Sequence, residues 1–431
     1  MTVYVLLALG LVIFIVAGFP VGFGAGIVST LGAMHFFGDV TDPRVASMMA
    51  RLLFDKIDSF LLLAIPFFLL AGRLMNTGGI TERLFGFVSL AVRPLKGGLG
   101  HANVVASTLF AGMSGSATAD AVGLGTVEMK AMLSAGYERE FSAGITAASS
   151  LIGPIIPPSI ALVAYGVSAE VSIGALFMAG IGPGLMLTFV FMAYVAALAH
   201  LRNFPSGAMA PWRELAMGFR NALLPLLMPV IIIGGIRGGV FTPTEAAAVA
   251  ALYAVVLSVI VYREIGWRQL LSEIRQTMVD SAVIMLIIAF TSAFGVIMIH
   301  GNVPQTLAAG MAELTSNASV LMLLLVVFWL GVGLFMAQTP AILVLTPILV
   351  PTAEAFGIDL IFFGIVMTLT LTLGLLTPPV GMVLFALVRV TGLSFERLAL
   401  SVIPYLFLVL MVVILLILYP ELVLYLPRTM G

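Results

Sequence analysis

Hydroxyl and amide side chains stand inside four stretches where Gly and Pro interrupt apolar sequence. The stretches are residues 111–125 (AGMSGSATADAVGLG), 152–159 (IGPIIPPS), 335–341 (FMAQTPA) and 374–379 (GLLTPP). Proline removes a backbone donor and glycine weakens a helix, so each stretch predicts a helix break. Carbonyl and hydroxyl oxygens at such breaks suit a hard cation such as Na⁺, and half-helix N-termini suit a carboxylate.

The side chains in these breaks that carry oxygen are candidate ligands for a cation. They are Ser114, Ser116, Thr118, Ser159, Gln338, Thr339 and Thr377. Ordinary kinks packed by small residues are the alternative, because Gly and Pro are frequent in transmembrane helices. Four clusters in two matched pairs favour a binding site over that alternative.

A few charged residues lie within apolar sequence, where a charge is functional by default; Arg73 and Asp280 are two of them. Asp120 follows Ser114 by six positions and either tunes a cation site or caps the helix after the break. Arg389 lies ten positions past Pro379 and either attracts an anion or extends to the membrane surface.

The composition predicts a polytopic α-helical membrane protein. The chain is 61% hydrophobic and 9% charged, against roughly 25% charged residues in soluble domains, and its mean hydropathy is +1.20. Apolar runs long enough to span a bilayer are residues 3–18, 173–199, 222–236, 246–261 and 400–418. The sequence has no basic patch, so a nucleic-acid partner is not expected. The absence of cysteine excludes disulfides and thiol catalysis.

Two amphipathic segments, residues 46–60 and 262–279, place charges among apolar side chains. Such segments predict helices that lie in the membrane interface. They either brace a scaffold against a moving part or form solvated loop helices.

The chain contains two related halves. Residues 136–159 match residues 357–380 at Gly, Phe and Pro positions that lie 221 residues apart. A stretch that begins at Ile65 matches one that begins at Ile288, so that Gly72 falls on Gly295. The matched pairs around the breaks are Gly153 with Gly374, Pro157 with Pro378, and Pro158 with Pro379. Matched interruptions in an apolar chain are typical of a secondary transporter whose site lies between two repeats.

The repeats set the expected domain boundaries. Residues 1–199 form the first repeat, 200–220 an interfacial connector and 221–431 the second repeat. Each repeat is expected to hold one re-entrant hairpin, around residues 102–131 and around residues 319–352.

The charges near the two hairpins predict their orientation. Arg93, Lys96, Lys130 and Arg139 flank the first hairpin, whereas residues 300–360 hold neither Lys nor Arg. Because Lys and Arg collect on the cytoplasmic side, the hairpins are predicted to enter from opposite faces of the membrane. This is inverted-topology symmetry.

Several motifs together resemble the large membrane subunit of tripartite ATP-independent periplasmic (TRAP) transporters. They are FFLLAGRLMNTGGITERL, SGSATADA, GPIIPPSI, GGVFTPTEAAAVAALY and LGLLTPPVG, and the resemblance runs through nearly the whole chain. The combination of GGVFTPTEAA with two PP breaks is specific. The resemblance implies an all-α, multi-pass protein of the bacterial inner membrane, with two inverted-topology repeats, re-entrant helical hairpins and broken helices. The implied fold is of the ion-transporter-superfamily, elevator type.

The resemblance also implies a function and partners. Proteins of this kind import an organic acid anion, such as a C4-dicarboxylate or sialic acid, with a Na⁺ gradient as the driving force. A periplasmic substrate-binding protein delivers the substrate, and a separate small membrane subunit with four helices joins the large one.

Residue roles follow by position from the resemblance. It makes Ser114 to Ala117 and Gln338 to Pro340 the hairpin tips, and Gly153 to Ser159 and Gly374 to Pro379 the helix breaks. The implied Na⁺ ligands are Ser114, Gly115, Ser116, Thr118, Gly153, Pro157, Gln338, Thr339, Pro340, Gly374, Thr377 and Pro378. The expected substrate-binding residues are Ser114, Ser116, Ser159, Gln338, Thr339 and Thr377, together with the cationic Arg389.

Gln338 departs from the pattern that it resembles, which has an acidic residue at this place. The neutral amide leaves the identity of the organic acid open. Three other functions also stay open. One is a stand-alone Na⁺-coupled anion carrier that works without a binding protein. Another is an intramembrane enzyme, for which the sequence offers no set of acid, base and nucleophile. The third is a passive channel, which the broken hairpins disfavour.

Overall fold

The computed structural model describes residues 2–39 and 41–429, and every regular element in them is a helix. Six helices are long and apolar enough to cross a membrane: residues 60–77, Ile173–Leu201, Trp212–Arg237, residues 243–261, Trp267–His300 and Phe395–Leu418. A bent pair, Val303–Leu314 with Ala318–Gly333, raises the total to seven if it counts as one span. The expected all-α, polytopic architecture is confirmed.

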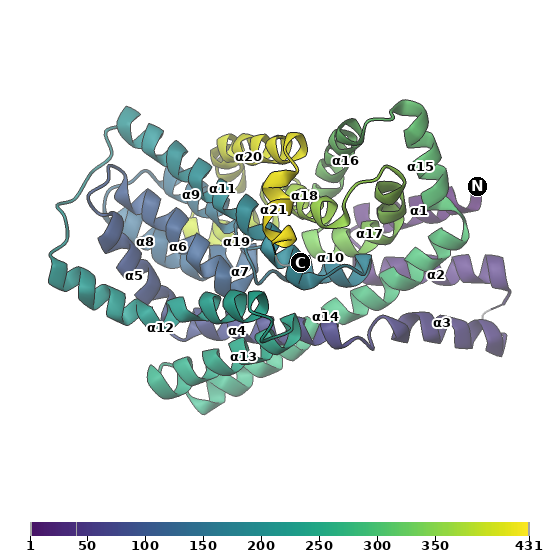
Figure 1. Cartoon of the computed structure of the whole chain (residues 1–431), viewed down its shortest axis with the longest axis horizontal. Helices are drawn as coiled ribbons and strands as arrows, with labels where there is room; N and C mark the ends of the chain where they lie inside the picture. The colour runs from purple at the N-terminus through teal and green to yellow at the C-terminus, as the bar shows by residue number, and fades with distance from the viewer. Residues whose placement is uncertain (1, 40, 430–431) are drawn as a thin grey trace.

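The first half of the chain contains α1 to α11, which include a helical hairpin and a broken helix (Figure 1). Its elements are α1 (Thr2–Val16), α2 (Val21–Phe37), α3 (Pro43–Asp55), η1 (Phe60–Leu63), α4 (Ala64–Thr77), α5 (Ile80–Val92), α6 (Gly98–Ser114), α7 (Ala117–Val122), α8 (Leu124–Ser134), α9 (Arg139–Ser150), α10 (Ile160–Ala169) and α11 (Ile173–Leu201).

The second half repeats that order. Its elements are α12 (Trp212–Arg237), α13 (Pro243–Val255), η2 (Val256–Val261), α14 (Trp267–His300), α15 (Val303–Leu314), α16 (Ala318–Gly333), α17 (Gln338–Ala355), α18 (Leu360–Leu373), η3 (Gly374–Leu376), α19 (Met382–Thr391), α20 (Phe395–Leu418) and α21 (Glu421–Arg428). The irregular segment before α12, residues 202–211, lies inside the connector predicted at 200–220.

Helices end and restart at all four stretches that Gly and Pro interrupt. The first hairpin is α6 followed by α7 and α8, and the second is α16 followed by α17. One broken helix is α9 with α10, and the other is α18 with α19. In Figure 1, α6 and α8 lie to the left of α7 and α10, and α16 and α17 lie to the right.

The halves pack against each other reciprocally. Helix α13 of the second half packs along α4 of the first, and α2 of the first half packs along α14 of the second. The half-helices cross in the same way, because α10 packs on α17 and α19 packs on α7. Two repeats related by a pseudo-two-fold axis produce this exchange of equivalent contacts.

Residues 262–279 do not form a separate helix, because residues 267–279 are the first part of α14. Helix α14 is continuous for 34 residues, and Figure 1 shows it crossing the lower part of the molecule between α13 and α15. At about 1.5 Å per residue it is longer than the roughly 30 Å hydrocarbon core. The charged segment is therefore the first part of a spanning helix, whereas the segment at 46–60 holds the separate helix α3.

Candidate substrate and cation site

The tip of the first hairpin is an abrupt turn between α6 and α7. Helix α6 ends at Ser114, and Gly115 follows with φ +61°, a conformation that favours glycine. A Cβ at Gly115 would lie 2.2 Å from the carbonyl oxygen of Pro158. Ser116 then caps α7, because its hydroxyl accepts a hydrogen bond from the Ala119 N–H at 3.4 Å. The tip is therefore pressed against the break in the neighbouring helix.

The break between α9 and α10 contacts the same turn from the other side. A Cβ at Gly153 would lie 3.3 Å from the carbonyl carbon of Ser116. The Ser159 hydroxyl donates to the Pro154 carbonyl at 2.5 Å and accepts from the Leu162 N–H at 3.1 Å. Ser159 is fully buried, and both of these bonds hold the break and the start of α10 in place.

The second hairpin and its break are built alike. A Cβ at Gly374 would lie 2.3 Å from the Gly333 carbonyl oxygen, so this tip also touches its break. Gln338 is the first residue of α17 and is buried. Its amide Nε2 donates to the Thr368 carbonyl at 3.1 Å and to the Thr372 hydroxyl at 2.6 Å.

The tips line a common cavity of about 600 Å³. From the predicted ligands it brings together Ser114, Gly115, Ser116, Thr118, Gln338, Thr339 and Pro340. The breaks contribute Pro154 and Leu375 to the same lining. The lining does not include Gly153, Pro157, Ser159, Gly374, Thr377, Pro378 or Arg389.

Four helices begin at this cavity. Ala117 starts α7, Ile160 starts α10, Gln338 starts α17 and Met382 starts α19, and all four residues line the cavity. The first N–H groups of a helix lack partners within the helix, and the helix dipole adds partial positive charge there. The cavity therefore collects four positive helix ends, an arrangement that suits an anion.

Two charged residues that were singled out from the sequence, but not assigned to the site, line the cavity. Arg73 on α4 and Asp280 on α14 line the cavity and form an ion pair through Nη2 of the arginine. Asn76 also lines it, and nothing in the sequence pattern singled out that residue. The position of Arg73 and Asp280 within apolar sequence indicated that they are functional. It did not show which cavity their side chains face.

Asp120 and Arg389 both lie outside the lining of the cavity. Asp120 is buried in α7, and the described residues offer no hydrogen-bond partner to either of its carboxylate oxygens. Ser116 caps α7 and Gly123 precedes α8, so the capping role for Asp120 is wrong. Arg389 lies exposed in the last turn of α19, away from the cavity lining.

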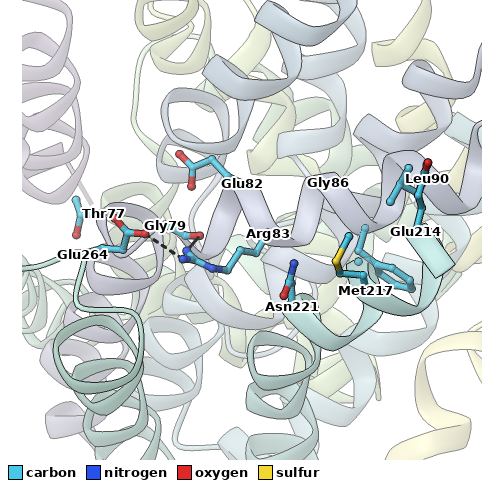
Figure 2. A pocket seen from close by; sticks show the side chains of 12 residues that line it. Thr77, Gly79, Glu82, Arg83, Gly86, Leu90, Glu214, Met217, Asn221 and Glu264 are labelled. Atoms are coloured by element: carbon cyan, nitrogen blue, oxygen red, sulfur yellow. Dashed lines mark hydrogen bonds and ion pairs between the residues drawn. The ribbon is translucent and has the colours of Figure 1, made fainter.

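A larger groove of about 810 Å³ lies elsewhere, between α5, α12 and the segment that joins η2 to α14. Figure 2 shows Arg83 in this groove turned toward Glu264, to which it donates at 3.0 Å. Glu82 and Glu214 also line the groove, so its carboxylates outnumber its guanidinium. Because that balance disfavours an organic anion, the cavity at the hairpin tips is the better candidate.

Comparison with known proteins identifies the family. Residues 8–422 match the family described as "Tripartite ATP-independent periplasmic transporter, DctM component". The chain belongs to this family. It is therefore a multi-pass protein of the bacterial inner membrane, as the resemblance implied.

The relatives carry names for different substrates. The sialic acid TRAP transporter large permease protein SiaM of Vibrio cholerae is 42% identical, over 96% of this chain and 95% of that protein. The C4-dicarboxylate TRAP transporter large permease protein DctM of Pseudomonas aeruginosa is 38% identical, over 90% and 91%. These names belong to permeases of transporters.

A solved structure has the same fold. The Alcanivorax borkumensis YdaH transporter, described as having an unusual topology, superposes with a TM-score of 0.62 over 96% of this chain and 97% of its own. The two sequences are 15% identical, so the similarity concerns the fold alone.

Proposed function

We propose that this TRAP large permease subunit imports an organic acid anion, such as a C4-dicarboxylate, sialic acid or a similar carboxylate, with a Na⁺ gradient as the driving force. The observation that carries the proposal is the start of four helices at one cavity between the hairpins. Partial positive charge at those ends stabilises a carboxylate that has left water. The permease names of its relatives support transport over catalysis.

Na⁺ is the proposed coupling ion, and the residues at the tips fit it. The Ser114 hydroxyl is buried without a hydrogen-bond partner among the described residues, so an oxygen is free for a ligand. Ser116 and Thr118 hold adjacent hydroxyl oxygens 3.1 Å apart at the edge of the same tip. Oxygen ligands of this kind suit a hard cation. A bound Na⁺ there offsets the charge of the substrate.

The remaining proposed ligands differ in whether a backbone carbonyl or a side-chain hydroxyl would contact the bound ion or substrate. Gly153, Pro157, Gly374, Thr377 and Pro378 lie at the breaks that touch the tips, where backbone carbonyls are the available oxygens. The Ser159 hydroxyl is already hydrogen-bonded to the Pro154 carbonyl and the Leu162 N–H. We therefore assign the breaks a role in cation binding through their carbonyls.

The proposed partners follow from the family. A tripartite transporter requires a small membrane subunit beside this chain and an extracytoplasmic binding protein that delivers the substrate. In the proposed cycle, the hairpins and broken helices move as one body. The helices α1, α2, α12 and α13 form the scaffold, and α4 and α14 are the arms between the two.

Uptake into proteoliposomes tests the proposal. The vesicles contain this chain with its small membrane subunit, and the radiolabelled substrates are succinate and N-acetylneuraminate. We expect uptake that requires both an inward Na⁺ gradient and the binding protein. Uptake with Na⁺ alone would instead establish a stand-alone carrier, and lipid turnover without Na⁺ dependence would establish an enzyme.

Two substitutions test the cation site. Ser116→Leu and Thr339→Leu place apolar bulk at the two tips, and each is expected to abolish Na⁺-dependent uptake while the protein still reaches the membrane. Unchanged uptake in both variants would contradict the assignment of the site. Leu185→Ala, on an exposed position of α11, is the matched control with normal uptake.

A further inference from the structure

The cavity has a second wall, opposite in character to the helix N-termini. Arg73, Asn76 and Asp280 line it, and they come from the arms α4 and α14. The side chains of Arg73 and Asp280 are 32% and 34% exposed, so their polar atoms remain within reach of a ligand. Ionised groups at membrane depth that face a cavity mark a substrate path.

Arg73 and Asp280 belong to an ion-paired group that carries more negative than positive charge. The Arg73 guanidinium donates to Asp280, and its Nη1 lies 3.5 Å from Oε2 of Glu273 behind it. Gln276 holds the other Asp280 oxygen through a hydrogen bond of 3.2 Å, so the carboxylate is fixed in place. Asp280 and Glu273 thus share one guanidinium, so this ion-paired group has a net charge of −1 when all three side chains are ionised; Glu273 lies outside the cavity lining.

The charge balance discriminates between two kinds of organic acid. A second carboxylate placed against this wall meets a net negative charge at reduced dielectric, where repulsion is stronger than in water. A hydroxyl group meets no such penalty, because it donates to Asp280 and accepts from the free N–H groups of Arg73 and Asn76. Hydroxyl recognition by fixed, partly buried polar groups also disfavours analogues that lack the hydroxyl.

We propose that the substrate is a polyhydroxylated monocarboxylate, a sugar acid, whose hydroxylated tail binds the wall formed by Arg73, Asn76 and Asp280. Its carboxylate faces the N-termini of α10, α17 and α19. This inference rests on the proposed function, anion transport, and specifies its substrate class. The cavity volume of about 600 Å³ lies within the ordinary range of small-molecule sites.

Direct binding to the permease is the test, since a binding protein would impose its own selectivity on uptake. The purified complex with its small membrane subunit is titrated in Na⁺ buffer with N-acetylneuraminate, gluconate, succinate and fumarate, and ligand-induced stabilisation against thermal unfolding gives each dissociation constant. We expect at least one of the sugar acids to bind tenfold or more tightly than either dicarboxylate.

The outcomes separate this inference from the proposed function. Dicarboxylates that bind as tightly as the sugar acids, or more tightly, overturn the substrate class and leave anion transport standing. No binding by any of the four probes overturns both.

Substitutions locate the selectivity on the wall. Asp280→Asn keeps the shape and removes one negative charge, so the ratio of dicarboxylate to sugar-acid affinity is expected to rise at least fivefold. Arg73→Gln is expected to weaken sugar-acid binding about tenfold. Glu421→Gln is the matched control, because its exposed ion pair with Arg428 lies outside the cavity, and it is expected to leave the ratio unchanged.

An unchanged affinity ratio in Asp280→Asn would overturn the role of the wall. It would show that the ion pair only supports the fold. If either variant does not fold, the wild-type affinities still decide the substrate class.

Discussion

The two breaks have matching sequences but different surroundings. Pro157 and Pro158 in the first half are buried, whereas Pro378 and Pro379 at the matched positions are exposed. Each break nevertheless touches its own hairpin tip, through Gly153 in one half and through Gly374 in the other. The local design is therefore shared, and the difference lies in how each unit sits in the molecule.

The two arms, α4 and α14, also have matching sequences but different contacts. A Cβ at Gly72 on α4 would lie 3.1 Å from Ser114 at a hairpin tip. A Cβ at the matched Gly295 on α14 would lie 2.9 Å from Pro347, nine positions after Gln338 starts α17. At 1.5 Å per residue, that contact is about 14 Å from the tip. One arm thus meets a hairpin tip, whereas the other meets the middle of a hairpin helix.

The largest expected effect comes from filling the tip contacts. Gly115→Ala meets both a left-handed φ and the Pro158 oxygen, whereas Gly374→Ala meets the Gly333 oxygen at an ordinary φ. Each is expected to abolish uptake, and Gly115→Ala is expected to lower the unfolding temperature more, because backbone strain adds about 1–3 kcal/mol.

Gly331→Ala is the control for both glycine variants, since open space surrounds that position on α16. Its uptake and unfolding temperature are expected to match the wild type. Full uptake by Gly115→Ala would contradict the contact between tip and break.

The second prediction concerns exposure at the starts of the half-helices. The natural chain lacks cysteine, so single cysteines report cleanly. Met382 at the start of α19 is 43% exposed, and Ile160 at the start of α10 is 8% exposed. A water-soluble maleimide is expected to label Met382→Cys at least tenfold faster than Ile160→Cys in the purified protein. Equal rates would show that the halves are not in different environments.

The third prediction concerns the neutral amide in the second tip. Gln338→Glu replaces a donor to Thr368 and Thr372 with a carboxylate, and it adds negative charge beside the proposed anion. Substrate affinity, measured by titration, is expected to fall about tenfold, which corresponds to about 1.4 kcal/mol. Thr372→Val removes one acceptor without adding charge, and a loss as large as that in Gln338→Glu would remove charge as the explanation.

The smallest effect is expected at the far ends of the half-helices. Glu170 ends α10 and pairs with Lys56, whereas Gly392 ends α19. The hydrogen bond and charge of Lys56 hold the pKa of Glu170 below its usual range. This pair therefore stabilises the fold at neutral pH, and its contribution is lost as the pH falls through that lowered pKa.

Glu170→Gln tests the contribution of the Lys56–Glu170 ion pair to stability. Because both side chains are exposed, the expected loss of stability at pH 7 is within about 1 kcal/mol. Thermal unfolding of wild type and variant is expected to converge once the pH has fallen below the lowered pKa of Glu170. A difference that persists at lower pH would assign the effect to packing.

Much of the local structure was predictable from residue type. Ser-Gly-Ser at residues 114–116 and Pro-Pro at 157–158 weaken or block helical hydrogen bonding, so helices end before these residues and restart after them. The extent of α14, 34 residues, was harder to predict from sequence, because its charged first part resembles an interfacial helix. A helix longer than the membrane is thick carries both kinds of segment, and local composition does not distinguish that case.

The sequence by itself determined the class of protein, the two repeats and the positions of the hairpin tips and breaks. These features depend on apolar length and on backbone groups that Gly and Pro control locally. The tertiary structure decided that four helix starts share one cavity, that Arg73 and Asp280 form its other wall, and that the matched breaks differ in exposure. Residues more than 200 positions apart meet there, and their distances depend on how the two halves pack.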